Sequence, residues 1–484
     1  MRRVVFVGLV ALALVAAATA SAGVVSTQTI SPNPSPFVDC SNQGFAGNYP
    51  NAEVEPWVSV DPLDSATAAA WQQDRWGDPS EGGAHGIVAW SSATSGNSWA
   101  PFTTCSGGTA ANNGNFDRAS DVWLSYGPDG RLYQVALVFD EATESQGITV
   151  STSTNDGATW SNPTFVDQLH QKSFTHGDDK ESITADPFHP GYAYVVWDRY
   201  SNQKPLYTDG HGQNANKGPA FFSRTTDGGK TWSAPQAIFA RDNGTIGNQI
   251  VVLPNGTLVD FFTNFIAHNV KGGVAFTAEL DSVRSNNQGQ TWSTPVVVSP
   301  MTPNGTYDPT NGQYVRAGDS LFDVAAAPNG TLYAVWQDSL FSGVDQVAFT
   351  KSTDGGLTWS MPRQISEAPP SFNDPAGQAF TPSVDVSANG SVAVTYYTFQ
   401  NTTSAAFLAT DYWAITSANA GTSWSPQLRL TPSSFNGELA PIAGGLMIGD
   451  YEGLAHRGNN FTAAYEVGNT PADPTDIQLT TFTP

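Results

Sequence analysis

One turn-like motif recurs six times along the 484-residue chain and constrains the fold more than any other feature. Successive copies begin 60 to 72 residues apart and align without a gap: each starts with serine or threonine, has glycine at its fifth position and ends in tryptophan. Self-similarity at a period of this length indicates a repeat architecture. The copies span Ser92–Trp99, Ser153–Trp160, Thr225–Trp232, Ser285–Trp292, Ser352–Trp359 and Ser417–Trp424.

Short β-rich runs separated by Gly, Pro, Asn and Asp turns fill the repeats, and helical periodicity is nearly absent. An apolar run such as Trp57–Val60 precedes a tight turn such as Pro128–Gly130, which suits a hairpin because Asn-Gly and Asp-Gly tolerate positive φ. A second run ends in an aromatic residue followed by polar ones, a third leads into the motif and a fourth leaves it. One four-stranded antiparallel unit per repeat predicts an all-β chain folded as a β-propeller.

The number of blades follows from the first strands, which are expected near residues 56, 121, 182, 249, 322, 383 and 449. The last unit lacks the motif and shows three strands, near 449–455, 460–467 and 476–482. The segment Val24–Ile30 is expected to supply its fourth strand and close a ring of seven blades. Six blades are the alternative, if the last segment pairs differently.

The chain begins with the pattern of a secretory signal peptide: Arg2-Arg3, an apolar run over Val4–Ala18, and small residues ending at Ala22. Residues 1–22 are therefore predicted to be removed, leaving 23–484 as a single propeller domain of a secreted, extracellular protein. The apolar run is too short for a membrane-spanning helix.

Only two cysteines are present, Cys40 and Cys105. In an exported chain they are predicted to form a disulfide, and two separate buried thiols are the alternative.

The formal net charge is −23, so the surface repels nucleic acid and anionic membranes. Neither is expected as a partner, and the protein is expected to be a soluble monomer. There is no phosphate loop and no dinucleotide fingerprint in the sequence, so no cofactor and no catalytic metal are expected. Asp178 and Asp179 with nearby carbonyl groups could bind a structural calcium ion, although EF-hand spacing is missing.

Residues that lead into the first strands are expected nearest the propeller axis, at the end that carries the longer loops. Acids crowd there with a few arginines, although only 13% of the chain is charged. Arginine pairs with the carboxylate of a sugar acid and carboxyl groups can act on a glycosidic bond, so an acidic oligosaccharide or polysaccharide is the predicted ligand. The candidates are Glu53, Glu55, Arg118, Asp121, Asp178, Asp179, Lys180, Glu181, Gln249, Arg316, Asp319, Asp323, Asp450, Tyr451 and Glu452, with Arg75, His85, Arg199, Lys204, Tyr207 and His268 from loops after second strands.

The six motifs resemble the Asp-boxes of the sialidase superfamily over nearly the whole chain after residue 22. The resemblance implies a structural role for the motifs, with each tryptophan packed between sheets. Sialidases hold the substrate carboxylate with arginines and use an aspartate acid and a tyrosine nucleophile assisted by a glutamate, an exception among glycosidases. The Arg-Ile-Pro motif of that family is missing, and Glu53–Pro56 stands about where it should be. The resemblance implies Tyr451 as the nucleophile, Asp121 as the acid, and Arg118 and Arg316 as the residues that hold the carboxylate. Glu452 is a further catalytic candidate, and Arg75, Arg199, Lys180 and Glu55 are further candidates for substrate contacts.

A second resemblance is to secreted seven-bladed polysaccharide lyases that act beside a glucuronate, such as rhamnose–glucuronate lyases, on the segments Gly82–Gly86 and Asp117–Asp121. Elimination needs a base for the C5 proton and a cation for the developing charge. His85 or Tyr451 could be the base, with Arg118 or Arg75 as the cation. Sialidase-like hydrolysis is preferred, and elimination and non-catalytic binding of glycans or proteins are the alternatives.

Overall fold

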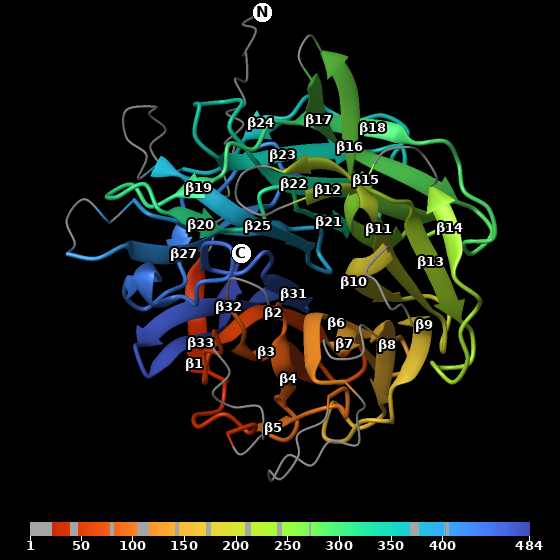
Figure 1. Ribbon diagram of the computed structural model, residues 1–484, viewed down its shortest axis with the longest axis horizontal. Helices are drawn as coiled ribbons and strands as arrows, with labels where there is room; N and C mark the ends of the chain where they lie inside the picture. Colours follow the sequence, from red (N-terminus) through yellow and green to blue (C-terminus); the bar gives the residue numbers. More distant parts are fainter. Residues whose placement is uncertain are drawn as a thin grey trace, which may run out of the picture.

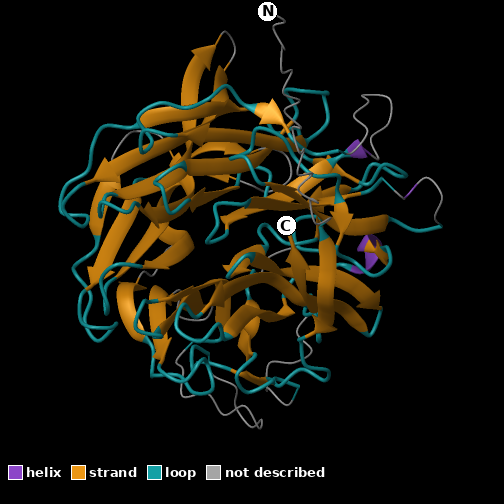
Figure 2. Ribbon diagram, turned by 180° about the vertical axis from the view of Figure 1, so that it is seen from behind, coloured by secondary structure: helices purple, strands orange, loops and turns teal. Residues whose placement is uncertain are grey.

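The computed structural model describes residues 22–38, 47–77, 82–103, 116–140, 145–170, 176–208, 214–239, 244–270, 273–367, 377–400, 402 and 406–484. Strands dominate this part of the chain, as predicted for an all-β protein (Figure 2). Within these residues, no helix has the length and apolar character needed to cross a bilayer. Residues 1–21 and both cysteines, Cys40 and Cys105, lie outside the described residues, so the predicted disulfide and signal peptide stay predictions.

Consecutive strands pair antiparallel into four-stranded units, and the first two units are joined into one eight-stranded sheet by the pairing of Ala84 with Ala119. The units are β2 (Glu53–Val60), β3 (Thr67–Arg75), β4 (Ala84–Ser91), β5 (Gly96–Ser98); β6 (Arg118–Tyr126), β7 (Leu132–Asp140), β8 (Ser145–Ser153), β9 (Thr164–His170); β10 (His176–Ala185), β11 (Ala193–Thr208), β13 (Ala220–Thr225), β14 (Gln236–Phe239); β15 (Gly244–Val252), β16 (Leu258–Val270), β17 (Gly273–Ser285), β18 (Val296–Met301); β21 (Phe322–Ala326), β22 (Leu332–Asp338), β23 (Gln346–Ser352), β24 (Arg363–Gln364); β25 (Ala379–Val386), β26 (Val392–Thr398), β27 (Ala409–Ser417), β28 (Leu428–Arg429); and β31 (Gly453–Arg457), β32 (Asn460–Thr470), β33 (Asp473–Thr483), β1 (Gly23–Thr29).

The first strands of these units stand around a common centre (Figure 1). Strand β2 contacts β6, β6 contacts β10, and the contacts continue through β15, β21 and β25 to β31, which returns to β2. The ring closes because β1 pairs antiparallel with β33, from Gly23 opposite Thr483 to Thr29 opposite Gln478. The fourth strand expected from Val24–Ile30 is thereby confirmed.

The last unit differs from expectation at its start. Its first strand begins at Gly453 and not near residue 449, because Gly449 has a φ of 80° and turns the chain before the strand. Just before this turn, β30 (Leu446–Met447) pairs in parallel with β20 (Tyr314–Arg316), which belongs to no four-stranded unit. The small sheet of β19 (Thr306–Tyr307), β20 and β30 therefore joins two distant parts of the chain.

Five of the six recurring turns share one hydrogen-bond pattern. In the copy that starts at Thr225, the Gly229 amide donates to the Thr225 hydroxyl at 3.0 Å, and the Thr231 amide donates to Asp227 Oδ1 at 3.0 Å. The copies that start at Ser153, Ser285, Ser352 and Ser417 repeat both bonds, with Asn or Asp as the acceptor. In the first copy, Gly96–Ser98 instead forms β5 and pairs with β4. The motif is therefore a self-bonded turn.

The tryptophan that ends each motif packs against its neighbouring unit, as the structural role requires. Trp292 meets Phe222 edge-on with ring centroids 5.4 Å apart, and Trp424 meets Phe349 in the same way at 5.2 Å. Each phenylalanine lies in the preceding unit. At Gly289, with a φ of 82°, an added Cβ would lie 2.1 Å from the Phe222 ring, so glycine is required there for both backbone and packing reasons.

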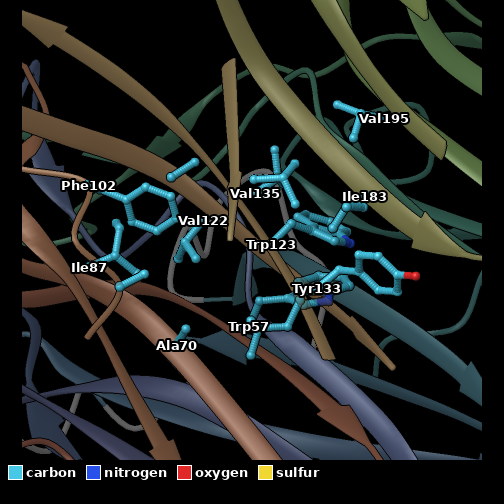
Figure 3. Close-up of a cluster of buried hydrophobic side chains, with 14 of the residues drawn as sticks. Trp57, Ala70, Ile87, Phe102, Val122, Trp123, Tyr133, Val135, Ile183 and Val195 are labelled. Carbon is cyan, nitrogen blue, oxygen red and sulfur yellow. The ribbon is translucent and has the colours of Figure 1, made fainter. Parts of the chain in front are cut away.

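A large apolar cluster joins the first three units near the centre (Figure 3). Trp57 of β2 and Trp123 of β6 stack with ring centroids 3.3 Å apart, and both are less than 10% exposed. Tyr451 packs beside them, 5.4 Å from Trp123 between ring centroids. Adjacent units are therefore locked together by aromatic contacts directly at their innermost strands.

Candidate functional site

The innermost strands are kinked at the same place in several units. The pairing register shifts at a bulge in β2, β6, β10, β15 and β25, and one residue of each bulge has positive φ. A non-glycine residue in this region is strained and persists only where its surroundings hold it. Bulges redirect side chains and are common beside functional sites. The kinked residues are Glu55, Asp121, Lys180, Gly247 and Thr381, with φ between 41° and 78°.

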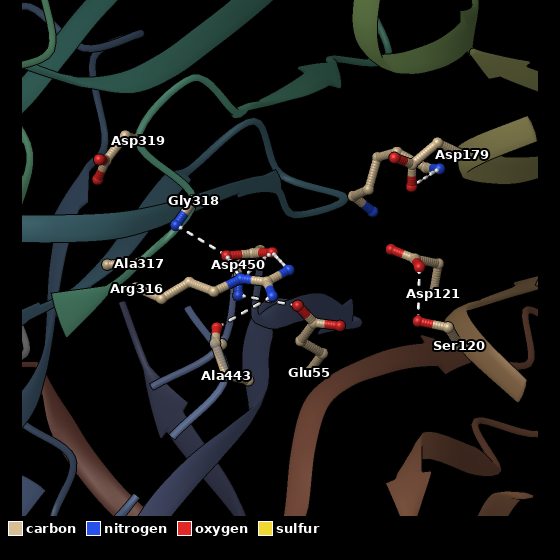
Figure 4. A network of polar contacts seen from close by, with 12 residues as sticks. Glu55, Ser120, Asp121, Asp179, Arg316, Ala317, Gly318, Asp319, Ala443 and Asp450 are labelled. Atoms are coloured by element: carbon tan, nitrogen blue, oxygen red, sulfur yellow. Dashed lines mark hydrogen bonds and ion pairs between the residues drawn. The ribbon is translucent and has the colours of Figure 1, made fainter. Parts of the chain in front are cut away.

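Six charged residues at this level form a group that we call the axial cluster. Burial raises the pKa of two of its carboxyls, Glu55 and Asp179, and charged members act on one another across the centre, as Asp121 and Arg316 both do on Asp179. Figure 4 shows five of its members: Glu55, Asp121 and Asp179 come from the first strands β2, β6 and β10, and Arg316 and Asp450 from outside the four-stranded units. The axial cluster consists of Glu55, Arg75, Asp121, Asp179, Arg316 and Asp450.

An ion pair between Arg316 and Asp450 lies on one side of the cluster. Arg316 Nε donates to both carboxylate oxygens of Asp450, at 3.0 and 2.9 Å, and Nη2 also bonds Oδ2. The Gly318 amide donates to the same carboxylate at 3.2 Å. Burial favours the neutral acid, but the Arg316 charge prevails and lowers the pKa of Asp450. Asp450 is therefore an ionised, oriented carboxylate.

Glu55 and Arg75 lie beneath this ion pair. The Asp450 amide donates to Glu55 Oε1 at 3.1 Å, and Gln72 Nε2 bonds the other Glu55 oxygen. Arg75 Nη1 in turn donates to Gln72 Oε1 at 2.6 Å, so Gln72 links the guanidinium to the carboxyl. Burial, followed by Asp450 and Asp121, raises the pKa of Glu55 to about 8. Glu55 is thus neutral near pH 7.

Two further carboxyls face the opposite side of the cluster. Ser120 Oγ donates to Asp121 Oδ2 at 2.7 Å, and the Lys180 amide donates to Asp179 Oδ1 at 2.9 Å. Both side chains are partly exposed. Burial, followed by the neighbouring charge of Asp121, raises the pKa of Asp179 to about 7. A carboxyl whose pKa lies near 7, beside a second carboxyl on the adjacent first strand, is an arrangement suited to acid–base catalysis.

Tyr451 and Lys180 are stacked just inside the axial cluster. Lys180 Nζ lies 3.6 Å from the centroid of the Tyr451 ring, a cation–π contact. The Tyr451 hydroxyl donates to the carbonyl of Val122 at 3.2 Å, and the residue is 7% exposed. Burial, followed by Glu55, raises the pKa of Tyr451 well above its ordinary value. The phenol is therefore neutral and bonded to backbone.

Glu452 is fully buried between the last two units. Tyr397 Oη donates to Glu452 Oε1 at 2.9 Å, and burial raises the pKa of Glu452 well above its ordinary value. The structure therefore places Glu452 in a core environment, although it follows Tyr451 in sequence.

Arg118 and His85 flank Trp76 at the edge of the first two units. Arg118 Cζ lies 3.6 Å from the centroid of the indole, and His85 meets the same ring edge-on at 4.0 Å. His85 Nδ1 lies 3.3 Å from Asp74 Oδ2, and within the described residues Nε2 has no hydrogen-bond partner. His85 is 3% exposed. These two candidates form a separate group from the axial cluster.

Arg199 forms hydrogen bonds with the carboxylates of two nearby aspartates. Its Nε donates to Asp178 Oδ1 at 2.7 Å, Nη2 bonds Asp167, and the guanidinium lies 4.1 Å from the Phe221 ring. Burial raises the pKa of Asp178 to about 6. Asp178 is therefore already paired, and the acidic groups whose spacing suits a metal ion involve other residues.

A pocket opens between the first strands next to the axial cluster. Its lining includes Trp57, Trp123, Tyr451 and Asp450. Aromatic walls beside carboxyl groups are typical of small-ligand sites.

The structure thus brings together four of the residues predicted to act in catalysis or substrate binding, Glu55, Arg75, Asp121 and Arg316, with Asp179 and Asp450 from the wider set of candidates. Sequence reasoning did not single out Gln72 or Ser120, which position the charged groups. Gln72 and Ser120 lie close in sequence to the candidates Arg75 and Asp121, but glutamine and serine do not by themselves indicate a functional site.

No family model and no curated protein matches the chain. Among solved structures, similarity is found to a protein of unknown function from Dyadobacter fermentans, at 12% identity and a TM-score of 0.49, covering 96% of this chain and 99% of the other. A Hadza microbial sialidase is 14% identical with a TM-score of 0.46, covering 95% and 96%. An alpha-L-arabinofuranosidase from Fusarium graminearum is 12% identical with a TM-score of 0.46, covering 72% and 89%. At these values, none of the three assigns an activity to this chain.

Proposed function

We propose that this protein is a glycoside hydrolase whose reaction takes place at the axial cluster. The observation that carries the proposal is the pair Asp121 and Asp179: two partly exposed carboxyls from adjacent first strands, with the pKa of Asp179 raised to about 7 by burial and by Asp121. A carboxyl that keeps its proton near neutral pH can protonate a leaving sugar oxygen, while an ionised one stabilises or attacks the anomeric carbon.

The roles then follow from the surroundings of each carboxyl. Asp179 is the general acid, and Asp121, oriented by the Ser120 hydroxyl, is the second carboxyl (Figure 4). The aromatic rings of Trp57 and Trp123 line the adjacent pocket and shield it from solvent.

An acidic glycan is the proposed substrate, in keeping with sialidase-like activity. Arg75 supports this preference: it is 4% exposed, it donates to the neutral amide of Gln72, and its Nε has no hydrogen-bond partner among the described residues. A buried guanidinium without a direct carboxylate partner favours an anionic ligand nearby.

We also propose the number of blades, the processing and the oligomeric state of the protein. A seven-bladed propeller is supported by the closed ring of contacts from β2 to β31 and by the pairing of β1 with β33. Secretion after removal of residues 1–22, the disulfide Cys40–Cys105 and a monomeric state are proposed on the sequence alone.

Elimination by a lyase mechanism is a second candidate, favoured by the group around His85. Its imidazole is oriented by Asp74, its Nε2 has no partner within the described residues, and Arg118 lies across the same indole. An oriented histidine beside a cation is suited to proton abstraction next to a carboxylate. Its burial means that a substrate reaches it only after local opening.

Product analysis distinguishes the candidates. The protein is incubated with sialosides, uronate polymers and neutral glycans such as arabinan, and the products are separated and identified. Saturated reducing sugars support the hydrolase, unsaturated uronates support the lyase, and binding without any product supports a glycan-binding propeller.

Variants then locate the reaction. Asp179→Asn and Asp121→Asn should each lower kcat/KM at least about a hundredfold, as removal of an acid–base group does. Asp129→Asn, an exposed turn residue at the opposite end of β6, is the matched control and should retain full activity. Tyr451→Phe tests whether Tyr451 is the nucleophile. Full activity of this variant would show that the hydroxyl takes no part in the reaction, and loss of activity with normal folding would show that it does.

A further inference from the structure

An acidic group lies where the ring closes, and none of its members belongs to the axial cluster. Glu53 begins β2, whereas Asp473 and Asp476 lie in β33, and one carboxylate oxygen from each lies within 4.8 Å of the others. Ala52 bridges Thr475, and the Glu53 amide donates to the Thr475 hydroxyl at 3.0 Å. The first and last units therefore meet at these three carboxyls.

Two of the carboxylate oxygens are buried without a donor. Gln73 Nε2 bonds Glu53 Oε1, while Oε2 has no partner among the described residues, and Glu53 is fully buried. Asp473 is 8% exposed; Asn33 and Asn469 donate to its Oδ2, and Oδ1 has no partner in the same part of the chain. A buried acceptor without a donor is destabilising, and so are neighbouring like charges.

Either a proton or a cation can relieve this arrangement. The charged neighbours that add to the burial of Glu53 are Asp476, Asp74 and Asp473, all acidic. A single proton on Glu53 neutralises only one of the three carboxyls. A divalent cation neutralises two charges and is within reach of one oxygen from each carboxyl at once.

The donor set selects the kind of cation. Carboxylate oxygens favour hard ions such as calcium over zinc or copper. Calcium accepts six to eight oxygens at about 2.3 to 2.6 Å, so its ligands lie up to about 5 Å apart, which the three oxygens satisfy. Magnesium needs about 2.0 to 2.1 Å and tighter octahedral geometry. Asp476 is partly exposed, which leaves room for water in the remaining positions.

We propose that Glu53, Asp473 and Asp476 bind a calcium ion that fastens the closing unit to the first. Ser31 Oγ already donates to Asp476 Oδ1 at 2.9 Å, and Asn33 bonds Asp473, so the segment after β1 reaches the same place. The ion joins the end of β1, the start of β2 and β33. Its role is to hold β2 against the sheet that contains β1 and β33, where the ring of described strands closes.

Calcium titration of the chelator-stripped protein tests the proposal. Thermal melting and isothermal calorimetry are followed as calcium chloride is added, with magnesium chloride in a parallel series. One calcium ion should bind per chain, and the melting temperature should rise with calcium concentration as binding to the folded state requires. Magnesium should raise it less. No substrate is present, so the result is independent of the proposed glycosidase activity.

Two variants and a control locate the ion. Asp473→Asn and Glu53→Gln keep side-chain size and should each remove the calcium-dependent rise. Asp64→Asn, in the other acidic group with Asp61 and Asp156, should keep it. Equal melting temperatures with and without calcium, together with no calorimetric binding, would overturn the proposal in favour of a shared proton. A response that survives Asp473→Asn but is lost in Asp64→Asn would overturn it as well. If a variant does not fold, the calcium titration of the unaltered protein still shows whether the protein binds calcium.

Discussion

Arg316 and Asp450, 134 residues apart in sequence, form an ion pair with three hydrogen bonds at the centre of the molecule. The pair is set by β20 and β30, in which Arg316 lies opposite Met447 in a parallel register. Neither strand belongs to a four-stranded unit. A short parallel pairing outside the repeats therefore positions a charged group inside them.

Removal of Arg316 should destabilise the fold. Breaking a buried ion pair by removing one partner costs about 3 to 5 kcal/mol. Because the Arg316 side chain is 26% exposed, the expected loss for Arg316→Met is smaller, about 2 to 3 kcal/mol. Urea denaturation measures it. The double variant Arg316→Met, Asp450→Asn should recover part of the loss, and a double variant that is less stable than the single one would contradict an uncompensated Asp450.

The activity should fall on the alkaline side of neutrality. The pKa of Asp179 is raised to about 7 by burial and by Asp121, and a general acid works only while protonated. As far as Asp179 is concerned, kcat/KM should therefore be constant below about pH 6 and should decline as the pH rises through about 7. A pH profile of kcat/KM checks this. In Asp179→Asn the residual rate should lose that decline, and an unchanged alkaline limb would assign it to another group.

The protein should be more stable in mild acid than at alkaline pH. Burial, followed by Asp450 and Asp121, raises the pKa of Glu55 to about 8. Burial also raises the pKa of Asp323 to about 7, although hydrogen bonds to this carboxyl act in the opposite direction. Both have values near about 4 when unfolded. The folded state thus holds protons that the unfolded state releases, so this contribution is complete below about pH 4 and is lost as pH rises to about 8. Thermal melting across this range measures the decline.

Glu55→Gln provides the control for that dependence. Glutamine cannot titrate, so the decline between about pH 5 and 8 should become shallower. Asp129→Asn, which changes an exposed turn, should leave the slope as it is. An unchanged slope in Glu55→Gln would show that this carboxyl is already ionised in the folded state and does not contribute to the decline.

The recurring turns should be sensitive to their acceptor residue. Asp227 accepts from the amides of Lys230 and Thr231 at 3.1 and 3.0 Å, and the Thr231 hydroxyl bond lowers the pKa of Asp227 to about 2. Asp227→Ala should cost about 1 kcal/mol, as loss of a comparable capping acceptor does. Asp227→Asn should cost less, because Asn155 and Asn287 occupy this place in other turns. Chemical denaturation of the three proteins gives the comparison.

Gly289 offers a way to separate backbone strain from packing. Its φ is 82°, and an added Cβ would lie 2.1 Å from Phe222. Gly256 has a φ of 81° with nothing within 4 Å. Gly256→Ala should cost about 1 to 2 kcal/mol from φ alone, and Gly289→Ala should cost about 1 to 3 kcal/mol more because the ring must move. Equal losses in urea denaturation would show that Phe222 yields without cost.

Local sequence patterns were sufficient to predict most of the fold. The six motifs and the Asp-Gly and Asn-Gly turns predicted the four-stranded units, and the segment Val24–Ile30 was predicted to pair with the last unit, as β1 does with β33. The start of β31 was missed because Gly449 turns the chain, and a single glycine in a β-rich run does not indicate where a strand begins.

The candidate site was only partly predictable. Charged residues before the first strands indicated Glu55, Asp121 and Arg316, which do meet. Arg118 also leads into a first strand, and His85 and Arg199 were expected in loops after second strands, but these three side chains pack against Trp76 and Phe221 instead. Whether a side chain turns toward the centre depends on β-bulges and positive φ at residues such as Glu55 and Asp121. Neither feature can be recognised from the type of a single residue.

The sequence by itself determined the repeat, the strand order and the self-bonded turns, because each depends on residues a few positions apart and on their local hydrogen bonds. Only the tertiary structure decided which charges meet at the axis and that three carboxyls converge where β2 and β33 join. Those relationships depend on register and on ring closure across hundreds of residues, where the interaction of two side chains is set by the path of the whole chain between them.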